Sequence, residues 1–235
     1  MVDVLMFSCG IDSLSAWFYL NKPKCVYVDM KTKYSEKEKQ CIKDLQKIIP
    51  DLKIKIIEGI DLGQFEVGEK AFIPHRNLIL AAIGSIYGDR IIIAGIEDDC
   101  VEDKSPKAFE VMENCLNVIS KPGKEIQLYS PFWNMSKSEI IKWMIKNVDN
   151  AEEILRTSIS CYSIEDGQCG RCPSCLRKAI AFEKNKIDIN FFNNDIRRYS
   201  LINQYIQNMK INKNLYTQKR RKESMEVFKK WGWKT

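Results

Sequence analysis

The chain has 235 residues, of which 45% are hydrophobic, and it carries a formal net charge of +6. This length and composition suffice for one large domain, or for one domain with a small addition, and they exclude an intrinsically disordered chain. No window reaches the roughly 18 uncharged apolar residues that a membrane span needs, and the N-terminus lacks the pattern of a secretion signal, so we expect a cytoplasmic protein with no membrane partner.

The first 150 residues alternate between predicted strands and predicted helices. Apolar runs predict strands over 2–8, 25–30, 53–60, 89–96 and 126–132, and helical periodicity or capping predicts helices over 13–21, 36–49, 76–88, 107–120 and 136–147. Such alternation is typical of parallel strands joined by crossover helices. We therefore predict an α/β fold with an open, mostly parallel sheet and helices on both faces.

From about residue 150 the pattern changes to helical segments around a group of cysteines. We predict an α/β domain over residues 1–150 and a small helical subdomain over 151–235 that ends in a basic tail. Residues 197–235 hold eleven lysines and arginines against only Glu223 and Glu226. This tail could contact nucleic acid through phosphates, but a solvated basic helix ending in an aromatic anchor is the favoured interpretation.

The stretch FSCGIDSL, residues 7–14, lies between the first predicted strand and the first predicted helix. Free backbone N–H groups and the positive end of the helix dipole meet at such a loop and bind anions. Ser8 and Ser13 add hydroxyl groups, and Gly10 lets the backbone approach a ligand closely. Asp12 is suited to capping the helix or to holding a magnesium-bound water.

Cys9, in the same loop, raises a separate question. A cysteine lacks glycine's freedom at positive φ, so we expect an ordinary backbone conformation at this position. As an alternative, Cys9 would be the nucleophile of a thiol enzyme, which needs a base within reach; His75, the only histidine, is the one histidine candidate.

Four of the nine cysteines crowd into the segment CYSIEDGQCGRCPSC. Without a secretion signal, an odd number of cysteines disfavours a disulfide framework. The spacing C-x7-C-x2-C-x2-C brings four thiolates around one tetrahedral Zn²⁺ at about 2.3 Å each, and such a closed shell is structural. An iron–sulfur cluster is the main alternative on the same ligands. The predicted ligands are Cys161, Cys169, Cys172 and Cys175.

The segment SCGIDS, residues 8–13, resembles the S-G-G-x-D-S loop of the PP-loop ATP pyrophosphatases. Together with the cysteine spacing, it narrows the resemblance to the 7-cyano-7-deazaguanine synthase (QueC) family. Other segments are similar to that family as well: IPHRN (73–77), SPFWNMSKSEII (130–141), TSISCY (157–162) and GQCGRCPSCLRKAIAFE (167–183). The resemblance covers about residues 2–190.

This resemblance implies a C–N ligase that converts 7-carboxy-7-deazaguanine and ammonia to the nitrile through the amide, with ATP and Mg²⁺, in queuosine biosynthesis or DNA modification. It also implies a homodimer. The implied catalytic residues are Arg76, Lys137 and Asp12, and the implied substrate-binding residues are Asn77, Arg76, Asp99 and Asp103. The implied ATP-binding residues are Phe7, Ser8, Cys9, Gly10, Ile11, Asp12, Ser13 and Leu14.

Two segments depart from the family pattern. MKTKY (30–34) replaces the family's G-Q, and EDDCVEDKSPKAF (97–109) replaces its Y-P-D-C-R segment. Both follow predicted strands, where ligands bind in open α/β sheets. A different substrate or a stop at the amide, as in a divergent phage or defence-associated member, is therefore an alternative. A PP-loop tRNA-thiolating enzyme and a zinc-knuckle binding module without catalysis are two others.

Overall fold

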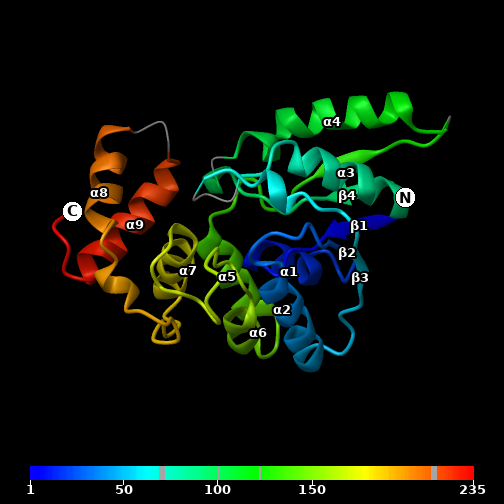
Figure 1. Cartoon of the computed structure of the whole chain (residues 1–235). Helices are drawn as coiled ribbons and strands as arrows, with labels where there is room; N and C mark the ends of the chain where they lie inside the picture. The colour runs from blue at the N-terminus through cyan, green and yellow to red at the C-terminus, as the bar shows by residue number, and fades with distance from the viewer. Residues whose placement is uncertain (69–71, 100, 122, 213–215) are drawn as a thin grey trace.

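Five short strands form one open sheet in the computed structural model, which describes residues 1–68, 72–99, 101–121, 123–212 and 216–235 (Figure 1). The strand order is β3-β2-β1-β4-β5, and every neighbouring pair is parallel. This confirms the predicted α/β class. The observed strands are shorter than the predicted ones, because the apolar runs continue into the loops: β1 Asp3–Met6, β2 Lys24–Val28, β3 Ile54–Ile57, β4 Arg90–Ile92 and β5 Gln127–Tyr129.

Helices cover both faces of the sheet, with α3 and α4 on one side and α1, α2 and α5 on the other (Figure 1). Successive strand side chains point to opposite faces. Val4 and Met6 accordingly belong to the apolar cluster that includes α4, whereas Leu5 and Phe7 belong to the cluster that includes α1. The helices match the predicted ones closely: α1 Ile11–Tyr19, α2 Ser35–Ile48, α3 Arg76–Tyr87, α4 Pro106–Ile119 and α5 Lys137–Asn147.

Close approach of α3 to the sheet depends on Gly84. A Cβ atom added to this glycine would lie 2.8 Å from Ile91 Cγ2 on β4 and 2.9 Å from Met6 Sδ on β1. Real Cβ atoms do not come so near, so either these two side chains or α3 itself would have to shift. Gly84 thus sets how closely α3 packs on the two central strands.

A capping box begins α5, in agreement with the helix predicted from residue 136. The N-cap residue Ser136 accepts a hydrogen bond from the Glu139 backbone N–H at 3.3 Å, and the Glu139 carboxylate accepts one from the Ser136 backbone N–H at 2.8 Å. Two orphan N–H groups of the helix are satisfied in this way. The box makes Lys137 the first residue of α5.

The C-terminal part consists of helices that pack on the same core as α1 and α5. Their bounds are α6 Ala151–Thr157, α7 Pro173–Lys184, α8 Ile202–Ile211 and α9 Gln218–Lys230. One apolar cluster extends from Leu5 in β1 to Phe228 in α9, and the final tryptophans, Trp231 and Trp233, pack against it. The basic tail is therefore a docked helix with an aromatic anchor. Among the described residues, no helix has both the length and the apolar character for a membrane span.

The strand order places a topological switch point between β1 and β4. The chain fills the sheet from β1 through β2 to β3, then returns to the other side of β1 for β4 and β5. Open α/β sheets bind ligands at the carboxyl ends of the strands beside such a point. The loop that follows β1 and the segment that follows β4, residues 93–99, meet at this edge.

Candidate functional site

The loop after β1 is closed by its two serines. The Ser8 backbone N–H donates to Ser13 Oγ at 3.2 Å, and the Ser13 hydroxyl is also 3.2 Å from both Ser8 Oγ and the Gly10 carbonyl oxygen. A Cβ atom added to Gly10 would approach nothing closer than Ser8 Oγ, at 3.6 Å. A Cβ atom there would only make ordinary van der Waals contacts, and α1 begins directly after this glycine without a side-chain cap. The start of α1 therefore presents N–H groups that suit an anion.

Asp12 does not cap α1, which corrects one of the two roles considered for it. Gly10 is the N-cap residue, and Asp12 lies inside the first turn. Its carboxylate accepts hydrogen bonds from Lys137 Nζ at 2.6 and 2.7 Å, and the two side chains are only 16% and 15% exposed. The fold thus brings together two of the predicted catalytic residues, from the first turns of α1 and α5.

Asp99, a predicted substrate-binding residue, forms ion pairs with cationic side chains of the protein. It pairs with Arg177 of α7, and Lys104 Nζ lies 3.5 Å from its other carboxylate oxygen. Burial alone would raise the pKa of Asp99, but Arg177, Lys104 and Lys137 hold it well below its usual range. Arg177 was missed by the sequence analysis, although its place two residues after Cys175 could have indicated a cation near the cysteine cluster.

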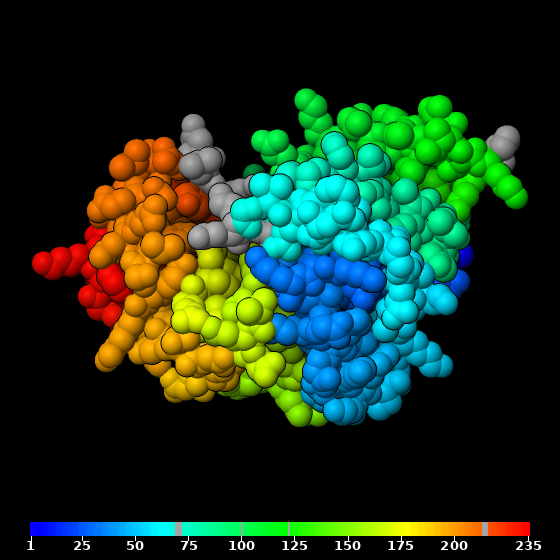
Figure 2. Space-filling model, viewed as in Figure 1, coloured from blue at the N-terminus to red at the C-terminus, as the bar shows by residue number. Residues whose placement is uncertain are grey.

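A second group of polar residues lies near Cys9, at the start of α2. The Tyr27 hydroxyl donates to the Glu38 carboxylate at 2.9 Å. Burial raises the pKa of Glu38 to about 7, against the opposing effects of Tyr27 and Arg76. The ring of Tyr34 lies 5.6 Å from that of Tyr162, which follows the first cysteine of the cluster. Figure 2 shows the chain around residues 155–165, in yellow-green, lying against α2, in blue. Local sequence patterns gave no sign that Tyr27, Glu38 and Tyr162 would lie near this loop.

The predicted residues at the start of α3 form a compact turn. His75 is the N-cap residue and has a left-handed backbone with φ of 58°. Asn77 is 2% exposed, and its Nδ2 atom has no hydrogen-bond partner in the described part of the chain. Arg76 acts electrostatically on Glu38 and Tyr34. Asp103 lies in the 3₁₀ turn Glu102–Lys104, which packs against α3.

The prediction for the backbone at Cys9 was wrong. Cys9 has φ of 55°, the left-handed conformation that a glycine adopts without strain. Its thiol is fully buried and donates to the Glu38 carbonyl oxygen at 3.3 Å. Burial, together with the neighbouring Cys41 thiol, raises the pKa of Cys9 well above its usual value. A thiolate nucleophile needs the opposite environment, so the thiol-enzyme alternative loses its support.

The four predicted cysteines converge. The Sγ atoms of Cys161, Cys169, Cys172 and Cys175 all lie within 4.8 Å of one another. Three of the sulfurs accept backbone N–H groups at 3.4 Å, donated by Ser163, Arg171 and Cys175. Thiolates in a tetrahedral zinc shell lie roughly 3.8 Å apart, so small side-chain movements suffice to enclose the ion. The donor set therefore fits structural zinc.

The turn at Gly170 holds this cysteine cluster in shape. Gly170 has φ of +68°, and a Cβ atom there would lie 2.2 Å from the Asn194 carbonyl oxygen. The Asn194 side chain in turn donates to the Cys169 carbonyl oxygen at 2.7 Å. Only glycine combines a left-handed backbone with such close contact to a neighbouring segment of the chain.

The segment before Cys161 connects the cysteine cluster to the loop after β1. The Ile159 backbone N–H donates to the Cys9 carbonyl oxygen at 3.0 Å. Lys178, fully buried in α7, donates to the Ser158 carbonyl oxygen at 2.6 Å. One bond fixes Ile159 and the other fixes the adjacent residue Ser158, so α7 and the loop are coupled through two consecutive residues.

These features define an open, all-parallel α/β protein with an anion-suited loop at its switch point and a four-cysteine metal-type centre in its helical part. A model of the family described as QueC, queuosine biosynthesis protein QueC, matches residues 58–186, which is more than half of the chain. The chain belongs to this family.

Curated relatives agree with this membership. The chain is 26% identical over 221 residues to a 7-cyano-7-deazaguanine synthase of Rickettsia conorii, an alignment that covers 78% of this chain and 95% of the relative. It is 28% identical over 188 residues to the synthase of Buchnera aphidicola, with 74% and 73% covered. The corresponding protein of Methanobrevibacter smithii is 29% identical over 142 residues, with 57% and 60% covered.

Proposed function

We propose that this protein converts 7-carboxy-7-deazaguanine and ammonia to 7-cyano-7-deazaguanine at the expense of ATP. The observation that carries the proposal is the Asp12–Lys137 pair beside the loop at residues 8–13, in a chain that belongs to the QueC family. A cation and a row of free N–H groups at one place are what a polyphosphate requires.

In the first step, a carboxylate oxygen of the substrate attacks the α-phosphorus of ATP, and pyrophosphate leaves. The N–H groups at the start of α1, with Ser8 and Ser13, would hold the departing pyrophosphate. Lys137 and Arg76 would neutralise negative charge that develops during the attack, where preorganised cations contribute most. Ammonia then attacks the acyl carbon, and AMP leaves with formation of the amide.

In the second step, the amide oxygen attacks another ATP, and pyrophosphate leaves again. Loss of two protons and AMP from the adenylated amide then gives the carbon–nitrogen triple bond. The same cations, Lys137 and Arg76, would serve both steps, because each step turns a substrate oxygen into an adenylate leaving group. Asn77, whose buried Nδ2 has no hydrogen-bond partner among the described residues, would donate to an acceptor on the substrate.

Mg²⁺ would enter with ATP, and Asp12 is the carboxylate placed to hold one of its waters once Lys137 turns to the phosphates. Zinc would be held by Cys161, Cys169, Cys172 and Cys175, where it contributes folding energy and stays away from the reaction. Asp99 and Asp103 remain our candidates for substrate contacts, with Asp99 acting through Arg177.

A related activity, ending at the amide or using another deazapurine acid, is the second candidate. The specific observation in its favour is the use of residues 97–109 within the protein: Asp98 contacts α9, Asp99 pairs with Arg177, and Phe109 lies in the apolar cluster around α4. Because these residues make contacts within the protein, the segment would present a different surface to the substrate from the Y-P-D-C-R segment that it replaces.

Mass spectrometry of the products tests both candidates. The purified zinc-loaded protein is incubated with the carboxy-deazaguanine, ammonia, Mg²⁺ and ATP, and the nitrile, the amide, AMP and ADP are quantified. Nitrile with pyrophosphate and AMP supports the main proposal, and amide alone supports the second. Absence of nucleotide consumption with every deazaguanine acid tried would contradict both.

We further propose that residues 1–150 act as the ATP-binding domain and residues 151–235 as the zinc-binding part of a cytoplasmic homodimer. Nucleic acid is not a favoured partner, because several cations of the basic tail are paired within the protein, such as Lys219 with Glu139 and Lys230 with Glu183. Light scattering of the eluted protein measures the oligomeric state, and tRNA titration at two salt concentrations tests the tRNA-thiolating alternative.

A further inference from the structure

We infer that Glu223 of α9 is a positioning residue for Lys137, which makes the basic C-terminal helix a part of the reaction site. The inference rests on the proposed function, because that proposal gives Lys137 its role. It also assigns a task to a segment for which the sequence offered only solvent exposure or nucleic-acid binding.

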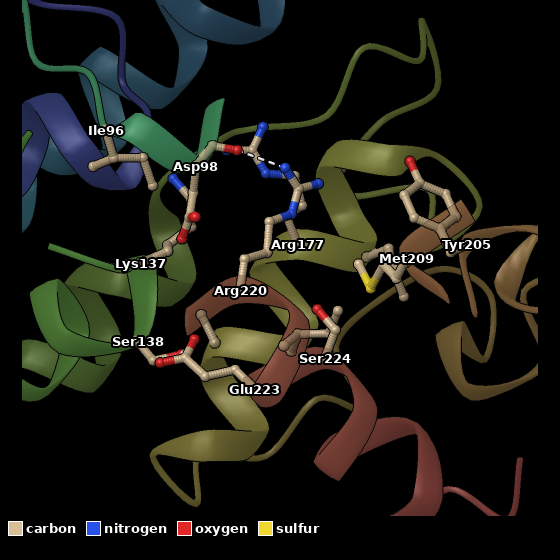
Figure 3. Close-up of a pocket in the computed structure, with 13 residues that line it drawn as sticks. Ile96, Asp98, Lys137, Ser138, Arg177, Tyr205, Met209, Arg220, Glu223 and Ser224 are labelled. Atoms are coloured by element: carbon tan, nitrogen blue, oxygen red, sulfur yellow. Dashed lines mark hydrogen bonds between the residues drawn. The ribbon is translucent and has the colours of Figure 1, made fainter. Parts of the chain in front are cut away.

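Glu223 holds the residues on both sides of Lys137. One carboxylate oxygen accepts the Ser136 hydroxyl at 2.8 Å, and the other accepts the Ser138 hydroxyl at 2.8 Å. The two serines are 1% and 7% exposed, so water does not compete for these hydroxyls. Figure 3 shows Glu223 extending from α9 towards Ser138 at one side of a small cavity of ≈ 30 Å³, which Lys137 also lines.

This position also suits the electrostatics of α5. The carboxylate lies at the N-terminus of the helix, where negative charge is stabilised by the helix dipole. Ser136 is the N-cap residue of α5, so the bond from Glu223 orients the group that begins the helix. A hydroxyl that donates to a carboxylate and accepts from a backbone N–H is held in one rotamer, which steadies the first turn of α5 that carries Lys137.

The start of α9 holds the opposite wall of the same cavity. The Thr217 hydroxyl donates to the Asp98 carboxylate, and Arg220 donates to the Asp98 carbonyl oxygen at 2.5 Å. The next residue, Asp99, carries the ion pair with Arg177. One helix thus braces the segment after β4 and the start of α5, the two segments that present Asp99 and Lys137.

The division of contacts along α9 separates positioning from packing. The apolar contacts come from its second half, where Val227 and Phe228 are buried. Its first half makes the polar contacts with Asp98, Ser136 and Ser138. A change at Glu223 therefore leaves the anchoring half of the helix in place.

The test uses Glu223→Ala and Glu223→Gln in the full-length, zinc-loaded protein, with Glu226→Gln as the matched control. Glu226 lies three residues further along α9 and pairs with Lys184 on the surface, 2.5 Å away. We expect kcat of Glu223→Ala to fall about 10-fold or more, because small misplacements of a reactive group have effects of that size. KM for ATP should change less and zinc content should match the control, while thermal unfolding reports the separate cost of the two lost hydrogen bonds.

Three further measurements separate positioning from general loosening. Amide hydrogen exchange at residues 136–139 should accelerate in Glu223→Ala and not in Glu226→Gln. Glu223→Gln keeps the length and one acceptor oxygen, so it should recover part of the lost rate. The effects of Glu223→Ala and Ser138→Ala should be less than additive, because both remove the same contact.

The inference is overturned if kcat and ATP affinity of Glu223→Ala equal those of the control. If the wild-type protein consumes no ATP with any deazaguanine acid, the proposed function fails on its own. Calorimetric titration with Mg·ATP then judges the inference: a loss of about threefold or more in Glu223→Ala alone supports it, as expected for a displaced phosphate-binding cation, and equal affinities overturn it.

Discussion

Lys137 Nζ lies 2.6 and 2.7 Å from the two carboxylate oxygens of Asp12, which joins the first turns of α1 and α5. Lys137→Met should reduce kcat about 100-fold by removing a preorganised cation. It should also lower the free energy of unfolding by roughly 1–3 kcal/mol, since the Asp12 carboxylate loses its partner. Steady-state kinetics and urea unfolding measure the two effects.

Lys142→Met is the control for this substitution. Lys142 is exposed on the same helix, so its replacement should leave both quantities near the wild-type values. Equal kinetics for the two variants would remove Lys137 from the reaction, and a loss of stability without a loss of rate would reduce the pair to a structural contact.

Cys9 offers a comparison of two substitutions. Cys9→Gly removes the thiol and relieves the left-handed backbone, whereas Cys9→Ala removes the thiol and keeps the strain. We expect Cys9→Gly to retain activity within about twofold, because stability at such a site changes by only about 1 kcal/mol. Inactivation of both variants to the same extent would show that the thiol itself is required.

Zinc removal should destabilise the helical part. Cys172→Ser should lose bound zinc, measured by elemental analysis, and should unfold at a lower temperature, because binding energy of a structural ion is folding energy. Cys115→Ser provides the control, since Cys115 is exposed on α4 and distant in sequence from the cluster. Stoichiometric zinc in both variants would contradict the assignment of the ligands.

Glu38 should make stability depend on pH. The pKa of Glu38 is about 7 in the folded protein, whereas the ordinary value, which applies to the unfolded chain, is 4.5. Between these two pH values the folded protein keeps a proton that the unfolded chain has released. Stability contributed by Glu38 therefore falls as pH rises through this window, and the full penalty is present above about pH 7. Glu38→Gln removes the penalty and keeps an oxygen for Tyr27.

We expect Glu38→Gln to exceed the wild type in unfolding free energy at pH 8 by at most about 3 kcal/mol, and to match it near pH 4.5. Guanidinium unfolding at four pH values measures the difference. Glu36→Gln, on the exposed side of the same helix, should show no such trend. A constant difference at all four pH values would mean that Glu38 titrates normally.

Local patterns predicted the elements well because their signals lie within a few residues. The capping box at Ser136 and Glu139 fixed the start of α5, and the cysteine spacing identified residues that do converge. The backbone at Cys9 could not be predicted in this way. Its left-handed conformation depends on contacts with the Glu38 and Ile159 segments, which lie far away in the sequence.

Pairings between distant segments were beyond local patterns for the same reason. Nothing near Glu223 indicates that its carboxylate meets Ser136 and Ser138, because the helix around it is dominated by lysine and arginine. In the sequence, Arg177 belongs to the cysteine segment, whereas in the folded protein it forms an ion pair with Asp99. Charge counting describes a surface, and only the packed structure says which charges have partners.

The bond from the Ile159 N–H to the Cys9 carbonyl has a consequence for transplanting parts of this protein into relatives. It joins two peptide groups, so no side-chain substitution can restore it once either backbone shifts. A chimera that takes residues 151–190 from another family member would import that member's backbone path at this point. The loop at residues 7–14 and the cysteine segment therefore have to be exchanged as a set.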